Sequence, residues 1–331
     1  MGEKDPPAIC KNAYTLDSHS LRFMFREKDS IMSNTELIRE LRALTSAGMK
    51  DCKDALEEAN WDLQKAVDIV KVKGLNIADG RTGRVAADGR VVIMSAADND
   101  LSVMVEVNCQ TDFVAASQNF INFSEIAAAT LMGEAVQNRT FNVNDLESAR
   151  KELVSTTKEN IVVRRWWVEE ALDRSVRVFE YIHSNNKIGV LLTMKAPTVE
   201  AANSGDFHLL GQELAMQIAA MNPLAVDAER ISVEEKVRQG MIFRTQLAEE
   251  KKPEKMWEKI LEGKFRKWNT EVCLLEQESV VVPKTTVKQV VKNVGTKLGG
   301  EIQIVNFVRC QVGEGIEKKQ DNLAEEVAKM M

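Results

Sequence analysis

The chain has 331 residues, of which 44% are hydrophobic, 28% are charged and only 5% are aromatic. This length can support two or three domains with cores of their own, and the composition favours helices. A net charge of −6 argues against a surface built mainly to bind nucleic acid, and no apolar run approaches the roughly 20 residues that span a bilayer.

The first residues do not have the features of a targeting segment. They lack the apolar stretch of a secretory signal, and they contain acidic residues that a transit peptide avoids. Periodic hydrophobic patterning begins only after Met32. We therefore expect Met32 to be the natural start and residues 1–32 to be a disordered extension with no assigned role.

Residues 33–76 are predicted to form a compact bundle of three short helices. Apolar residues recur every three or four positions in three successive segments, which are separated by short breaks. Ser33 or Asn34 can cap the first helix, and Asp62 can cap the third. A bundle of this size is marginally stable alone, so we expect it to be tethered to a larger body.

Residues 77–90 are rich in glycine and aspartate and are predicted to be a linker. Core subdomain 1, residues 91–175, then begins with two strands that turn residues join into a hairpin. In the second strand apolar residues alternate with Ser102, Met104, Glu106 and Asn108, which predicts a half-buried strand. The elements expected in this subdomain are strands at 91–96, 101–107 and 161–168 and helices at 115–132 and 143–157.

The same order of elements recurs in core subdomain 2, which is predicted to comprise residues 176–230 and 270–315. A hairpin followed by a helix, found twice, suggests two related subdomains. The elements expected here are strands at 176–182, 188–194, 272–275 and 302–308 and helices at 206–221 and 287–298. A C-terminal module, residues 316–331, is expected to contain a short helix at 321–330.

Residues 231–269 are predicted to form a helical hairpin inserted in core subdomain 2. The segment is highly charged and helical in pattern, and Pro253 breaks it near the middle. Each arm carries one narrow apolar face, which is what an antiparallel coiled-coil pair needs. The hairpin is long enough either to pair two copies of the chain as a homodimer or to reach another partner.

Motifs for covalent chemistry are missing from the sequence. Its five cysteines are scattered and odd in number, which argues against a disulfide framework or a zinc site and indicates a reducing cytoplasm. The segments 74–82 and 313–318 approach a phosphate loop and a glycine-rich loop but lack the required spacing. We therefore expect no metal, no cofactor and no enzymatic reaction.

The stretch NCQTDFVA, residues 108–115, is the least expected part of the sequence. It places Asp112 and Phe113 in a connection between a strand and a helix, where the chain should be at the surface. Spacing alone allows two interpretations. Phe113 could be a core residue beside an N-capping Asp112, or both could contact a partner. His183, in a predicted hairpin turn, could likewise be a solvated turn residue or a contact residue.

Four stretches together resemble the elongation factor Ts family. LRALTSAGMKDCKDALEEANWDLQKAV at 41–67 is similar to its N-terminal ubiquitin-associated-like domain, and EVNCQTDFVA at 106–115 to its most characteristic motif. IHSNNKIGVLL at 182–192 and FVRCQVGEGIEK at 307–318 resemble its second-subdomain hairpin and its C-terminal core strand. The order of the four is that of the family, and only the extension falls outside the match.

The resemblance implies an α+β fold and a guanine-nucleotide exchange factor for elongation factor Tu, a GTPase that delivers aminoacyl-tRNA to the ribosome. In that family an Asp-Phe pair inserts between helices of the partner's nucleotide-binding domain. The matching residues here are Asp112 and Phe113, flanked by Thr111 and Val114. The resemblance does not say whether Asp112 orients the phenylalanine or competes for groups around Mg²⁺.

The resemblance also implies further contacts with the same partner. Met49 matches the contact turn of the N-terminal bundle, and His183 matches a histidine near the partner's phosphate-binding region. The helical hairpin at 231–269 corresponds to the long form of bacterial members, where it makes peripheral contacts together with the C-terminal helix. An alternative function is an interaction module or scaffold in which the N-terminal bundle binds ubiquitin-like folds.

The sequence departs from the family pattern at four places. Leu-Thr-Ser at 44–46 stands where the family has Arg-Thr-Gly, Trp61 and Lys158 stand where it has glycine, and Gln217 stands where it has histidine. Loss of the first glycine removes the residue best suited to a left-handed turn, so we expect Asn60 to adopt that conformation. These departures affect local contacts and affinity rather than the assignment.

Overall fold

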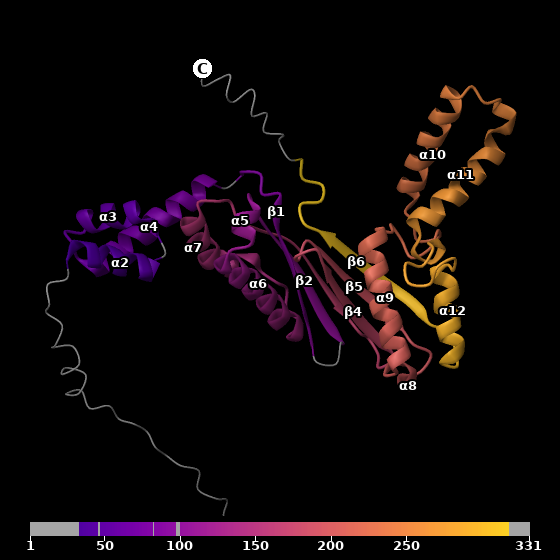
Figure 1. The fold of residues 1–331 in the computed structure, drawn as a ribbon, viewed down its shortest axis with the longest axis horizontal. Helices are drawn as coiled ribbons and strands as arrows, with labels where there is room; N and C mark the ends of the chain where they lie inside the picture. Colours follow the sequence, from indigo (N-terminus) through magenta and orange to yellow (C-terminus); the bar gives the residue numbers. More distant parts are fainter. Residues whose placement is uncertain (1–32, 46, 82, 97–99, 318–331) are drawn as a thin grey trace, which may run out of the picture. The chain divides into compact units, whose positions relative to one another are not determined.

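The computed structural model describes residues 33–317 except residues 46, 82 and 97–99, and the fold is α+β (Figure 1). The chain divides into two compact units, one ending at Lys71 and the other beginning at Val72. The expected extension at 1–32 and the expected helix at 321–330 lie outside the described residues.

The N-terminal unit contains three helices: α2 (Asn34–Thr45), α3 (Met49–Glu58) and the first part of α4 (Leu63–Arg81). Ser33 caps α2 reciprocally, because its hydroxyl accepts from the Glu36 N–H at 3.3 Å while the Glu36 carboxylate accepts from the Ser33 N–H at 2.8 Å. Asp62 caps α4 through the Lys65 N–H, as expected. The core is small and fully enclosed: Leu41, Cys52, Ala55, Leu56, Ala59, Ala66 and Val70 are all buried.

Two details of α4 and the turn before it differ from expectation. Asn60 has the expected positive φ of 52°, but Trp61 also adopts a left-handed conformation, with φ of 62°. Residues 77–81 of the predicted linker are helical, because α4 continues through Gly74 and Gly80 to Arg81. A glycine costs a helix only about 1 kcal/mol, and no proline interrupts this stretch.

The first sheet has the order β1-β2-β3, formed by β1 (Asp88–Ser95), β2 (Leu101–Cys109) and β3 (Val162–Glu170), all antiparallel. The predicted hairpin of the first two strands is confirmed by their continuous pairing. The prediction that the second strand is half-buried is wrong. Its polar face is enclosed as fully as its apolar face, with Ser102, Glu106 and Asn108 at most 1% exposed.

Helices cover one face of this sheet. The first is α6 (Gln118–Val136), which lies along the strands, and it is followed by a 3₁₀ turn (Val143–Leu146) and α7 (Glu147–Thr157) (Figure 1). Ser117 caps α6 by accepting from the Phe120 N–H. The core between helices and sheet contains Val103, Val105, Val107, Phe120, Phe123, Ala127, Leu131, Leu153, Val154 and Ile161. This core fixes the end of β2, where the unusual NCQTDFVA stretch begins.

The second sheet has the order β4-β5-β6, formed by β4 (Val176–His183), β5 (Ile188–Lys195) and β6 (Gln303–Gln311). A short helix α8 (Val199–Ala202), which the sequence did not predict, leads into α9 (Gly205–Met221). Helix α9 packs on the sheet so closely that a Cβ at Gly211 would lie 2.5 Å from the Phe179 ring. Helix α12 (Val287–Lys297) adds to the same core.

The two sheets contact each other directly. Val91 and Met104 of the first sheet pack with Val178, Leu191 and Cys310 of the second. A Cβ at Gly189 would lie 2.6 Å from the Val91 side chain, so glycine is required for this close approach. The second sheet therefore covers the face of β2 that the sequence pattern assigned to solvent.

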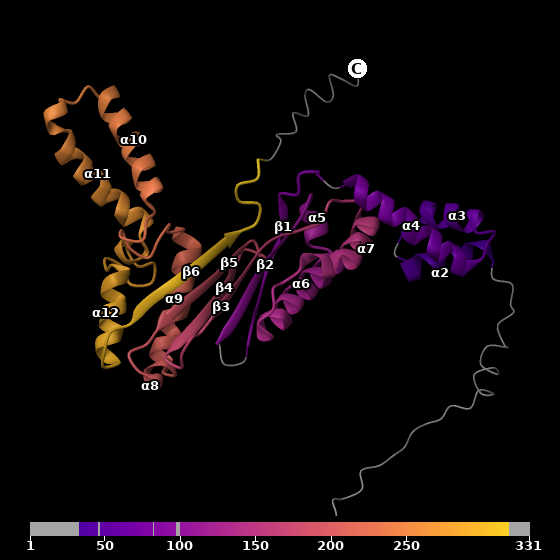
Figure 2. The same ribbon diagram turned by 180° about the vertical axis from the view of Figure 1, so that it is seen from behind.

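The inserted hairpin consists of α10 (Val233–Glu249), a 3₁₀ turn (Glu254–Met256) and α11 (Trp257–Val272), which lie side by side (Figures 1 and 2). Rings of Phe243 and Phe265 meet edge to face at 5.3 Å between the arms. The strand predicted at 272–275 is wrong, because α11 runs to Val272 and a 3₁₀ turn (Leu274–Glu276) follows. Short buried apolar runs do not distinguish these structures.

None of the helices in the described part of the chain combines the length and the apolar content that crossing a bilayer requires.

Candidate functional site

The NCQTDFVA stretch forms a separate turn of helix between β2 and α6. Helix α5 (Asp112–Ala115) is capped by Thr111, whose hydroxyl accepts from the Val114 N–H at 3.4 Å. Ala115 is buried in the core of the first sheet, and Val114 packs against it. Asp112 is exposed, and Phe113 is 84% exposed. The interpretation of Phe113 as a core residue beside an N-capping Asp112 is therefore wrong.

This short helix is anchored on one side only. Its second half contributes Val114 and Ala115 to the core, whereas Asp112 and Phe113 in its first half are left at the surface. An exposed phenylalanine gains nothing from the hydrophobic effect within its own chain. The arrangement can supply an apolar and an acidic group to another molecule, and it offers no reactive group of its own.

The nearest cysteine is not a nucleophile. Cys109 ends β2 and is fully buried, and its thiol donates to the Thr111 carbonyl at 3.1 Å. Burial, together with the negative charges of Glu159 and Asp88, raises the pKa of the Cys109 thiol to about 12. The thiolate that nucleophilic or metal-binding chemistry requires is therefore not formed near neutral pH.

A carboxylate that sequence reasoning missed holds the start of this segment. Glu159 Oε2 accepts from the Gln110 and Thr111 N–H groups, each at 3.0 Å, and Glu159 Oε1 accepts from the Thr111 hydroxyl at 2.6 Å. Glu159 stands 48 residues from Thr111 in the chain. The only sequence signal was its place in the triplet Lys158-Glu159-Asn160, which matches a family motif.

The residues beside Glu159 fix its position. Lys158 ends α7 in a left-handed conformation with φ of 60°, which turns the chain sharply after the helix. Asn160 is only 5% exposed and donates to the Arg84 carbonyl at 2.8 Å, and Ile161 is fully buried. Glu159 is therefore held between a tight turn and a buried strand start.

The left-handed conformation of Lys158 leads to a stability prediction. This conformation costs a residue with a Cβ about 1 kcal/mol or more relative to glycine. We expect the free energy of unfolding of Lys158→Gly to be about 1 kcal/mol larger than that of Lys158→Ala, so the glycine variant is the more stable. Lys158→Ala is the control, because it removes the same side chain. Thermal or urea unfolding of both variants measures this difference. Equal stabilities would show that backbone strain at this turn is negligible.

His183 lies at the end of β4, in a turn with unusual backbone geometry. Ser184, Asn185 and Asn186 have positive φ values of 53°, 54° and 66°. The His183 ring stacks on Tyr181, with centroids 5.8 Å apart, and its Nδ1 lies 2.9 Å from the Tyr181 hydroxyl. His183 is thus exposed but oriented, and its role as a contact residue stays a prediction.

Hydrogen bonds hold the His183 turn against the first sheet. The Asn186 carbonyl accepts from the Val91 N–H at 2.7 Å, and Lys187 forms an ion pair with Asp88. Asp88 is the strand partner of Cys109, the last residue before the Phe113 segment. The structure therefore brings the His183 turn and the Phe113 segment to the same end of the two sheets.

The remaining predicted contact residue, Met49, belongs to the N-terminal unit. It is the first residue of α3 and is 48% exposed, directly after the N-cap Gly48. Leu44, near the end of α2 and one of the departures from the family pattern, is 62% exposed. Both can reach a partner, and neither contributes to the enclosed core of this unit.

The departure from the family pattern at Gln217 lies in the interior of the protein. Gln217 is 1% exposed, and its amide group donates to Gln277 Oε1 and to the Glu278 carbonyl and accepts from the Val280 N–H at 2.8 Å. Its hydrogen-bonding groups tie the loop before α12 to helix α9. A change of contact surface at this position is therefore not expected.

Glu106 is the most enclosed charged residue among the described residues of the second unit. It is fully buried, and its carboxylate contacts Arg164 at 3.1 Å, Arg165 at 2.5 Å and the Gly313 N–H at 2.8 Å. Burial alone would raise the pKa of Glu106. The Gly313 N–H and the Arg165 guanidinium outweigh burial, so the pKa of Glu106 lies below its ordinary value.

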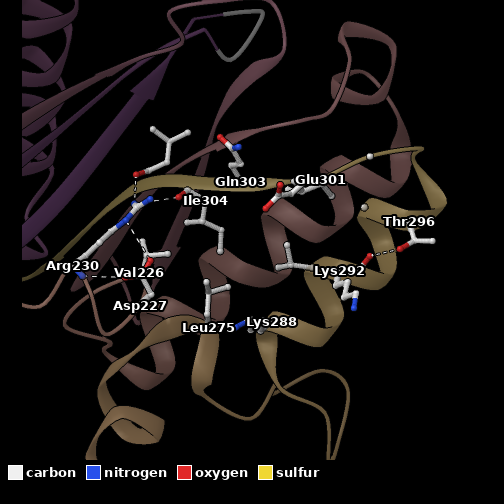
Figure 3. Close-up of a pocket in the computed structure, with 15 residues that line it drawn as sticks. Val226, Asp227, Arg230, Leu275, Lys288, Lys292, Thr296, Glu301, Gln303 and Ile304 are labelled. Carbon is white, nitrogen blue, oxygen red and sulfur yellow. Dashed lines mark hydrogen bonds and ion pairs between the residues drawn. The ribbon is translucent and has the colours of Figure 1, made fainter.

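A cavity of about 820 Å³ lies elsewhere, between helix α12 and the start of β6 (Figure 3). Arg230 lines it at one edge and is already bonded, to the Ile304 and Val305 carbonyls and to Asp227 (Figure 3). Lysines of α12 and apolar side chains make up much of the remaining wall. Within the described residues, no group of three His, Cys, Asp or Glu side chains could hold a metal ion.

Comparisons with known proteins agree with the resemblance seen in the motifs. A family model described as Elongation factor TS matches residues 110–314, and a model described as UBA-like domain matches residues 32–70. Elongation factor Ts of Symbiobacterium thermophilum is 42% identical over 296 residues, covering 88% of this chain and 96% of the relative. Elongation factor Ts of Clostridium botulinum (strain Eklund 17B / Type B) is 39% identical over 311 residues, covering 91% of this chain and 99% of the relative.

Proposed function

The chain belongs to the elongation factor Ts family of translation elongation factors, and from this premise we propose that it is a guanine-nucleotide exchange factor for elongation factor Tu. In this role it binds the GTPase, promotes release of GDP and Mg²⁺, and stabilises the nucleotide-free state. It acts by binding, without covalent chemistry.

The observation that supports this proposal most is the exposed Asp112-Phe113 pair on a helix anchored at its other end. A phenylalanine that is 84% exposed in the free chain can become buried in a partner. Burial of such a ring is worth roughly 1.5–3 kcal/mol. We propose that Phe113 is a wedge that enters the nucleotide-binding domain, with Asp112 beside it and Thr111 and Val114 as its supports.

One wedge is not enough for exchange. A factor that shifts the partner from its GDP-bound to its nucleotide-free state by roughly 10⁴-fold needs about 5.5 kcal/mol of differential binding. Phe113 supplies at most about half of that. Contacts by the His183 turn at the same end of the sheets, by Met49 and by the helical hairpin are proposed to supply the rest.

Release of a fluorescent GDP analogue from purified elongation factor Tu tests the function. We expect the full chain to accelerate release, with a rate that saturates as its concentration increases, while an equal concentration of an unrelated protein has no effect. By linkage, GDP must weaken binding of the chain by the same factor by which the chain weakens binding of GDP. An unchanged release rate at a large excess of the chain would contradict the proposal.

A further inference from the structure

Three donors at the start of the wedge segment converge on one side chain. The Gln110 and Thr111 N–H groups and the Thr111 hydroxyl all donate to the two oxygens of Glu159, at 2.6–3.0 Å. Gln110 and Thr111 lie beyond Cys109, whose pairing with Asp88 is the last in the β1–β2 ladder. The sheet therefore does not hold these residues, and Glu159 takes over where the ladder ends.

The same contacts determine how the helix of the wedge begins. Thr111 is the N-cap of α5, and the hydroxyl that accepts from the Val114 N–H is also the hydroxyl that donates to Glu159. A hydroxyl can do both, since it has one hydrogen and two lone pairs. The direction in which α5 leaves the sheet, and hence the direction of Phe113, depends on the position of Thr111.

We propose that Glu159 is a positioning residue for nucleotide exchange: it holds Thr111 so that Asp112 and Phe113 are presented in the orientation that enters the partner. This role rests on the proposed exchange function. Glu159 acts through the wedge segment, whose pre-ordering removes an entropic cost that would otherwise be paid on binding. Its own position is secured by the left-handed Lys158 and the buried Asn160.

Substitution of Glu159 tests the proposal in the GDP-release assay with saturating chain. We expect Glu159→Ala to lower the maximal release rate about tenfold, which corresponds to about 1.4 kcal/mol. Glu159→Gln keeps an oxygen for the two N–H groups and should retain the rate within about threefold. Glu152→Ala removes an exposed carboxylate from the same helical region and should leave the rate unchanged.

A double-mutant cycle distinguishes positioning from a general loss of structure. If Glu159 acts through the wedge, Glu159→Ala should change the rate of a Phe113→Ala chain by no more than about twofold, since the wedge is already gone. Independent, multiplying losses would overturn the proposal. A Glu159→Ala chain with the wild-type rate would overturn it as well.

Hydrogen exchange of the free chain gives a readout that does not depend on the partner. The Gln110 and Thr111 amides should exchange at least about tenfold faster in Glu159→Ala than in wild type, while amides within α6 keep their protection. Unchanged exchange at both amides would overturn the proposal. If the wild-type chain does not stimulate GDP release, the exchange function fails, and the positioning role fails with it even where these amides respond.

Discussion

Phe113→Ala is expected to lower the maximal rate of GDP release by between about tenfold and about a hundredfold. The ring is 84% exposed in the free chain, so its removal takes nothing from the core. In the complex it is proposed to become buried, which is worth roughly 1.5–3 kcal/mol, and that energy is spent on displacing the nucleotide. Stopped-flow release of a fluorescent GDP analogue at saturating chain measures the effect.

Leu172→Ala is the matched control for this prediction. Leu172 is 89% exposed and follows β3 at the opposite end of β2 from Cys109. We expect this variant to release GDP at the wild-type rate, and we expect both variants to unfold within about 0.5 kcal/mol of wild type, as surface substitutions do. A Phe113→Ala chain with full activity would show that the phenylalanine is not the wedge.

Asp112 can be separated from Phe113 in the same assay. Asp112→Asn preserves the shape of the side chain and removes its charge. A large loss with Asn would indicate that the carboxylate acts on groups around Mg²⁺, whereas a small loss would indicate that Asp112 only orients its neighbour. The sequence left these two roles open.

Local patterns predicted much of the fold because most elements carry their own signal. Turn residues and alternation located both hairpins, and helical spacing located α9, α10, α11 and α12 close to their observed bounds. Two failures were local, because helix α8 was missed and a strand was predicted at 272–275. The failure at β2 occurred where distant parts of the chain meet. The alternation in β2 placed Glu106 on a solvent-facing side. The sheet that covers this side is formed by residues 176–311, which a local pattern cannot reveal.

The candidate site shows the same division between local and distant signals. Spacing alone favoured a buried Phe113, which is wrong, and only the resemblance to a known family indicated that the residue is exposed. The capping role expected for Asp112 belongs to Thr111 and Ser117. Glu159 could not have been found from spacing, because it lies 48 residues from Thr111 in the chain. The two residues meet only because the segment from α7 to β3 returns to the end of β2.

The second large effect is expected at the buried Glu106. Removal of one partner from a buried ion pair leaves the other charge uncompensated, which costs about 3–5 kcal/mol. Arg164 and Arg165 retain 25% and 29% side-chain exposure, so we expect Glu106→Gln to lower the free energy of unfolding by about 3 kcal/mol, the lower end of that range. Urea unfolding followed by tryptophan fluorescence measures this loss.

Glu235→Gln is the control, because Glu235 also pairs with an arginine, Arg238, but at the surface of α10. Water screens the charges of a surface pair of this kind, so this variant should unfold with a free energy close to that of wild type. A Glu106→Gln chain no less stable than this control would show that both guanidinium groups can turn to solvent without cost.

The pH dependence of the Glu106→Gln effect follows from the lowered pKa of Glu106. A carboxyl group whose pKa is lower in the folded chain contributes its full stabilisation above its unfolded pKa, about 4.3, and loses it as pH falls through the folded value. The difference in the free energy of unfolding between wild type and Glu106→Gln should therefore be constant from about pH 7 to about pH 5 and should shrink below about pH 4.

Because Glu106 also accepts from the Gly313 N–H, the turn that follows β6 should loosen in the same acidic range. Hydrogen exchange of the Gly313 amide would detect this before the chain unfolds. A difference that stays constant into strong acid would mean that the charge of Glu106 does not supply the stabilisation.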